Sequence, residues 1–139
     1  HMYASQAYLN QFGTPEQPED LSHHKILSLV DNFTEQEIEL ISSQQDTRKV
    51  KIHPILMGSD FIMLNQLAVQ GCGIVLLPDP ISEDAVSSGQ LVRILPNWHA
   101  PHGIFHMVYP SRQGILPAVK VFIDFLVEQL TEQETLNIQ

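Results

Sequence analysis

The sequence predicts an α/β protein built around a doubly wound sheet, with helices on both faces of that sheet. Apolar segments of strand length alternate with capped helical segments along most of the chain, which is the β-α-β order of parallel sheets. The segment 73–78, Gly-Ile-Val-Leu-Leu-Pro, is short, almost wholly apolar and β-branched at its start. Such a segment is typical of a strand covered on both faces, so we expect it at the centre of the sheet.

The elements before residue 31 are short and have clear ends. Ser5 is a suitable N-cap, and Gly13 a suitable C-terminal residue, for a helix over 5–12. Pro18 is suited to begin a helical turn over 18–21. The apolar segment 25–30 that follows is predicted to be a strand.

The middle of the chain is predicted to contain a hairpin and then a strand-turn-helix unit. Residues 37–40 and 49–52 alternate polar and apolar side chains, which favours two antiparallel strands. A strand over 51–57 is expected to run into the turn Gly58-Ser59-Asp60. A helix over 61–69, closed by Gly71, follows this turn.

The rest of the chain is predicted to continue the same alternation. Asp79 and Pro80 are suited to cap and start a helix that Gly89 ends, and a strand over 91–95 follows. A last strand is expected over 103–109 and a C-terminal helix over 117–130, with a frayed polar tail over 131–139.

Composition indicates a globular chain that does not itself collect nucleic acid. The 139 residues are 43% hydrophobic and 17% charged, which is enough for one domain with a core. Its 16 carboxylates against seven Lys and Arg give a formal charge of -9, so DNA phosphates would be repelled. A single cysteine, Cys72, and the lack of an export or membrane-spanning segment in this sequence favour a cytoplasmic location.

The chain contains an ordered series of short motifs that is typical of one protein family. Residues 4–24 contain A-S-Q-A-Y-L, G-T-P, P-E-D-L and His24, similar to the family's A-S-P-x-Y-L, G-x-P, P-x-D-L and H. Residues 68–98 contain A-V-Q-G-C-G-I, L-P, G-Q-L-V and L-P-N-W, similar to A-x-x-G-x-G-I, L-P, G-x-L-V and L-P-x-W. The segments 108–112 and 122–126 complete the series. As an ordered set, these motifs resemble those of the LysR-type transcription regulators.

The resemblance implies two Rossmann-like lobes of the type II periplasmic-binding-protein fold, with a small effector in the cleft between them. It implies that 3–105 form a complete lobe, and that 106–130 are the return strand and helix of an incomplete second lobe. Ala4, Phe105 and His106 would then lie in the hinge strands. It also implies that DNA is contacted by a winged helix-turn-helix upstream of this chain, in a homo-oligomer.

The turn Gly58-Ser59-Asp60-Phe61 is the predicted effector site. Ligands of open α/β sheets bind at the carboxyl ends of strands, and free N-H groups at a helix start favour an anionic group, so a carboxylate effector would fit. In the LysR-type family that the sequence resembles, effectors contact the corresponding turn. The alternative is that Ser59 only caps the helix and that Asp60 repels an anion. With one wall of the cleft, this chain is expected to bind its effector weakly or not at all.

Other reactive side chains do not form a catalytic or metal-binding pattern. His99, His102 and His106 are close in sequence, but Pro101 and Gly103 interrupt any helix that would align them. Cys72 is interpreted as a small buried residue, and Trp98 either lines a cleft or packs on the lobe. We therefore predict no catalysis, no metal and no cofactor.

Two other protein classes remain as alternatives to a regulator. A lobe of a solute-binding protein for transport would share the fold, and a small hydrolase or metal enzyme would need a reactive cluster. The predicted C-terminal helix over 117–130 is apolar around most of its circumference. We expect the chain either to self-associate through Phe122, Phe125 and Leu126 of this helix, for example by exchanging it between two chains, or to leave the helix poorly ordered.

Overall fold

The computed structural model describes residues 1–29, 36–101 and 117–136. The chain divides into two compact units, His1–His102 and Gly103–Gln139. The first unit contains every described element except the C-terminal helix.

The larger sheet of the first unit has five strands in the order β5-β2-β6-β1-β7. Their bounds are β1 Met2–Ala4, β2 Ile26–Leu29, β5 Pro54–Gly58, β6 Ile74–Leu76 and β7 Val92–Ile94. β2 runs parallel to both β5 and β6, whereas β1 is antiparallel to β6 and to β7. The strand predicted to be central, β6, is the middle strand, so this prediction is confirmed.

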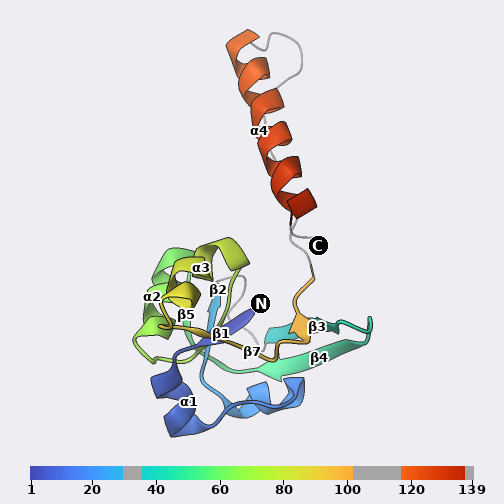
Figure 1. Ribbon diagram of the computed structural model, residues 1–139. Coiled ribbons are helices and arrows are strands. Elements are labelled where there is room, and N and C mark those ends of the chain that lie inside the picture. The colour runs from blue at the N-terminus through green and yellow to red at the C-terminus, as the bar shows by residue number, and fades with distance from the viewer. Residues whose placement is uncertain (30–35, 102–116, 137–139) are drawn as a thin grey trace. The chain divides into compact units, whose positions relative to one another are not determined.

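Helices cover both faces of this sheet, as the sequence predicts. On one face, α2 (Phe61–Val69) and α3 (Asp79–Ser87) enclose a buried cluster. Its members include Tyr3, Leu27, Val75, Leu64, Ala68 and Ala85. On the other face, α1 (Gln6–Phe12) and the 3-10 helix η1 (Pro18–His23) contribute to a second cluster. Figure 1 shows the sheet between the α2/α3 pair and α1. The doubly wound arrangement is therefore confirmed.

A smaller sheet has the order β4-β3-β8, with β3 at Gln36–Ser42, β4 at Thr47–Ile52 and β8 at Trp98–His99. β3 and β4 form the predicted antiparallel hairpin, in which Ile38 pairs with Val50. Leu40, Val50 and Ile52 are buried against the cluster on the α1 side. The hairpin thus closes that side of the core.

The prediction of one continuous strand over 51–57 is wrong. β4 ends at Ile52 in the small sheet, and β5 begins at Pro54 in the large sheet, where it pairs with β2. Pro54 has no backbone N-H, so the interruption of the strand at His53 leaves no N-H of residue 54 without a hydrogen-bond partner. The polar-apolar alternation of β4 gives way to the apolar run Pro-Ile-Leu-Met of β5 where the chain changes sheets.

Local contacts explain several of the turns. The Ser5 hydroxyl accepts the N-H of Tyr8 at 3.3 Å and caps α1, and Gly13 ends this helix with φ of 86°. Gly73, just before β6, has no room for a side chain, because a Cβ would lie 2.5 Å from the carbonyl oxygen of Lys25. Asp79 was expected to cap α3, but it is the first residue of the helix and the cap position is Pro78. Proline fits this position because Pro78 has a φ of -59°, close to the value that its ring imposes, with an extended ψ of 139°.

The C-terminal helix α4 spans Pro117–Leu136 and is therefore longer than the sequence predicts. Glutamate, glutamine and leucine after residue 130 are good helix formers, which accounts for the extension. Val121, Phe122, Phe125 and Val127 are each more than half exposed, at 68%, 57%, 53% and 57%. The strand predicted over 103–109 lies outside the described residues.

Candidate functional site

The four residues of the predicted site form one continuous strand-to-helix turn. β5 ends at Gly58, which is paired in register with Leu29 at the carboxyl end of β2. Ser59 and Asp60 are exposed, and Phe61 is half-buried as the first residue of α2, against the α2/α3 cluster. The turn therefore lies at the carboxyl edge of the parallel strands, where ligands of open α/β sheets bind.

The start of α2 is capped by Asp60 and not by Ser59. One carboxylate oxygen of Asp60 accepts the N-H of Ile62 at 2.7 Å. A carboxylate makes a stronger hydrogen bond to this N-H than a serine hydroxyl and also complements the positive end of the helix dipole. An anion that approaches this helix start therefore meets the negative carboxylate of Asp60, which already accepts a hydrogen bond from one of the free N-H groups.

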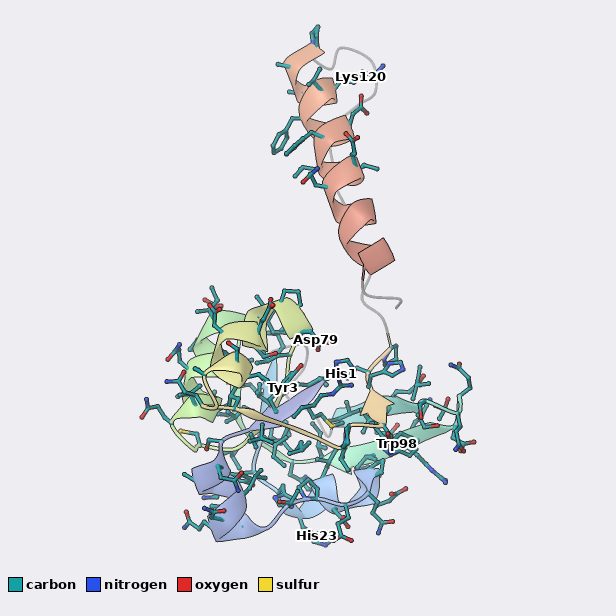
Figure 2. The ribbon with its side chains drawn as sticks, in the orientation of Figure 1. His1, Tyr3, His23, Asp79, Trp98 and Lys120 are labelled. Atoms are coloured by element: carbon teal, nitrogen blue, oxygen red, sulfur yellow. The ribbon has the colours of Figure 1, made fainter. Side chains whose placement is uncertain are left out.

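A second acidic side chain is fixed at the same edge of the sheet. Asp79 follows the carboxyl end of β6, and its carboxylate accepts a hydrogen bond of 2.7 Å from the hydroxyl of Tyr3 on β1. Figure 2 shows Tyr3 and His1 directed toward Asp79, and the His1 imidazole contacts the same carboxylate oxygen. Burial of the phenol, reinforced by Asp79, raises the pKa of Tyr3 to about 12. Tyr3 is therefore a neutral donor that holds the Asp79 carboxylate in place.

Asn65 is a polar residue on the buried face of α2. It shares this face with Leu64 and Ala68, and only 8% of it is exposed. Among the described residues, its side-chain oxygen has no hydrogen-bond partner. The sequence signal for Asn65 is its position one turn after Phe61 in an otherwise apolar stripe. The Tyr3-Asp79 pair had no such signal, because the two residues are far apart in the chain.

The structure separates the remaining predicted residues. Ala4 is fully buried on β1, between β6 and β7, while Phe105 and His106 lie outside the described residues. Cys72 is only half-buried and carries a free thiol, which differs from the expected buried position. Trp98 packs against the cluster on the α1 side, in agreement with the packing interpretation.

The described residues contain neither a metal-binding cluster nor a membrane-spanning helix. No group of three or more His, Cys, Asp or Glu side chains suited to a metal ion occurs within 1–29, 36–101 and 117–129. His99 belongs to that part, but His102 and His106 do not. None of the helices that the structure describes has the length and apolar character needed to cross a membrane.

Comparison with known proteins agrees with this architecture. Residues 1–131 match the family described as the LysR substrate binding domain. The chain belongs to the LysR family. The fold is accordingly that of LysR regulatory domains, which resembles type II periplasmic binding proteins.

Similar proteins within the LysR family are transcription regulators. An HTH-type transcriptional regulator of Xanthomonas campestris is 30% identical over 93% of this chain and 38% of its own length. An HTH-type regulator of Haemophilus influenzae is 37% identical over 83% of this chain and 40% of its own length. The regulatory domain of CrgA, a LysR-type regulator from Neisseria meningitidis, is 30% identical, with a TM-score of 0.69. The match to CrgA covers 93% of this chain and 63% of that domain.

These similarities favour a regulator over the two alternatives. The matched family and relatives are transcription regulators, neither transport proteins nor enzymes. The present chain spans about two fifths of the length of these two relatives.

Proposed function

We propose that this chain is the effector-sensing part of a LysR-type transcription regulator that acts in the cytoplasm. The observation that carries the proposal is the match of residues 1–131 to the LysR substrate binding domain. In the proposed mechanism, a small effector binds between two lobes and favours one arrangement of them. DNA-binding domains elsewhere in the intact protein respond to this shift in population.

The effector would contact the turn Gly58-Ser59-Asp60-Phe61 in this lobe. The position of the turn at the carboxyl ends of β5 and β2 supports this assignment. Residues 3–105 would be the lobe that carries the turn. Ala4, Phe105 and His106 would lie in the strands that connect it to the second lobe. Because this chain supplies one wall of the cleft, its own affinity for the effector would be weak.

The intact regulator would be a homo-oligomer, and α4 of this chain would also associate. The apolar side chains Phe122, Phe125 and Leu126 lie on one helix, and the two phenylalanines are more than half exposed. Each large apolar side chain left in water forgoes about 1.5 to 3 kcal/mol of burial, and contiguous exposed apolar surface favours association.

The effector assignment is tested by substitutions in the full-length protein that contains this chain. We expect Phe61→Asp to abolish the effector-induced change in promoter affinity while leaving effector-free DNA binding intact. Because Phe61 contributes to a buried cluster, the exposed residue Ser59 provides a second test. Ser59→Lys is expected to weaken the effector response without affecting the core.

The matched control for the second substitution is Ser87→Lys. Ser87 is exposed at the last turn of α3, away from the carboxyl edge, and lysine is favourable at a helix C-terminus. An effector response that is unchanged in folded Phe61→Asp and Ser59→Lys proteins would reject the site. A full-length protein that does not bind a promoter at all would reject the regulatory function.

A further inference from the structure

We infer that Met63 is a specificity-determining residue of the proposed effector turn, and that the effector packs an uncharged apolar group, such as an aromatic ring, against its thioether. This inference rests on the proposed function and names the chemistry of the effector at one wall of the cleft. It differs from the sequence-based expectation, in which the turn Gly58-Ser59-Asp60-Phe61 binds an anionic group.

The first argument is the position of the Met63 side chain, which reaches back to the turn. Met63 lies in the first turn of α2, and its terminal methyl group occupies the place where a Cβ at position 58 would lie. Side chains of an α-helix lean toward its N-terminus, which accounts for this direction. The contact brings the Met63 thioether to the backbone of Gly58, the first residue of the proposed site.

The second argument is that Met63 remains accessible to solvent. Although its methyl group is packed on Gly58, 42% of the residue is exposed, and the preceding Ile62 is 63% exposed. By contrast, Leu64, which also lies beside Gly58, is fully buried. A ligand group that covers exposed apolar side chains gains the free energy of their burial. Methionine is suited to this contact, because its sulfur is polarisable and packs favourably against aromatic rings.

The third argument is the charge of this wall. Residues 54–78, which include β5, the turn and α2, contain no Lys, Arg or His and one carboxylate, that of Asp60. This carboxylate accepts the N-H of Ile62 at 2.7 Å, at the start of the helix. An anionic group would therefore be repelled by Asp60 without a cation from this segment to balance it. An uncharged apolar group avoids this repulsion.

The test uses benzyl alcohol, a neutral aromatic compound, as the probe, with sodium acetate as the opposing probe. The chain is isotope-labelled at its methionine methyl groups, and NMR follows the Met63 resonance, which is identified by its loss in Met63→Gln. We expect benzyl alcohol to shift this resonance in a saturable manner and acetate to leave it unchanged. In Met63→Gln, followed at the backbone amides of 59–62, benzyl alcohol should bind at least about tenfold more weakly, equivalent to roughly 1.4 kcal/mol.

Val86→Gln is the matched control, because it makes an apolar-to-polar change at an exposed position near the C-terminal end of α3. It should bind benzyl alcohol like the wild type. Gly58→Ala tests the contact itself. Because the closest group is the end of a flexible side chain, this variant should fold with the Met63 methyl displaced, which shifts its resonance in the ligand-free protein.

Four results would each overturn the inference: a saturable shift of the Met63 resonance by acetate, no shift by benzyl alcohol, equal binding of benzyl alcohol by wild type and folded Met63→Gln, or an unchanged Met63 resonance in Gly58→Ala. The full-length protein separates this inference from the proposed function. An effector response that is weakened in Ser59→Lys but unchanged in Met63→Gln, with normal promoter binding, would reject the role of Met63 and leave the regulatory function standing.

Discussion

The helices α2 and α4 both contain many large apolar residues but have different surroundings. In α2, Leu64 and Ala68 are fully buried by the sheet and α3, and the exposed positions Ile62 and Met63 lie outside that stripe. In α4, apolar residues occupy most of the circumference, and Phe122 and Phe125 are more than half exposed. The difference shows that apolar patterning indicates how much cover a helix requires, but does not identify which element provides it.

The comparison is tested most strongly by equivalent truncations in the two helices. Leu64→Ala should lower the free energy of unfolding by about 2 to 5 kcal/mol, because it leaves a cavity beneath α2. Phe122→Ala should change it by less than about 0.5 kcal/mol, because the ring is largely in water. Urea unfolding at a concentration that keeps the chain monomeric measures both values. A large loss in Phe122→Ala under these conditions would show that α4 is covered within the chain.

The second test addresses what covers α4 at higher concentration. Wild-type chain at low micromolar concentration should form an oligomer in light scattering, whereas Phe122→Asp with Leu126→Asp should be monomeric, because charges are costly in an apolar interface. The control, Gln6→Asp with Gln129→Asp, adds the same charge at exposed polar positions and should remain oligomeric. A wild-type monomer with α4 folded would contradict self-association through this helix.

Local signals in the sequence were sufficient to predict most helices and strands of the first unit. Ser5, Gly13 and the apolar run of β6 determine their elements through contacts within a few residues, so their patterns predicted them correctly. The change of sheet at His53 depends on which strand β5 pairs with, and this is a long-range property. β8 was missed for a similar reason, since its two residues become a strand only beside β3.

The candidate site shows the same division between local and distant information. The turn Gly58-Ser59-Asp60-Phe61 was predicted because a strand end and a helix start are adjacent in sequence. Which side chain caps α2 depended on backbone geometry that residue types do not specify, and it is Asp60. Tyr3 and Asp79 are far apart in the sequence, so the hydrogen bond between their side chains is apparent only in the folded sheet.

The smallest predicted effect is a dependence of stability on pH that belongs to the first unit. α4 contains no histidine, whereas His24 of the first unit is half-buried beside α1. The hydroxyl of Tyr8 accepts the N-H of Lys25 at 2.9 Å and lies 3.1 Å from Nδ1 of His24. With its oxygen accepting from Lys25, the hydroxyl is free to donate its own proton to Nδ1 if the imidazole is neutral.

Burial lowers the pKa of His24 below its usual value of 6.5; the nearby Asp20 carboxylate opposes this shift and His23 adds to it. The unfolded chain therefore takes up a proton at higher pH than the folded chain. The contribution of His24 to stability is fully present above pH 6.5 and is lost as the pH falls from there through the folded pKa. We expect urea unfolding to show lower stability as the pH falls through this range. His24→Asn should weaken the dependence, because asparagine places an acceptor near the position of Nδ1 but does not titrate. An equal slope in wild type and His24→Asn would mean that other groups cause the pH dependence and that the Tyr8-His24 contact does not contribute to it.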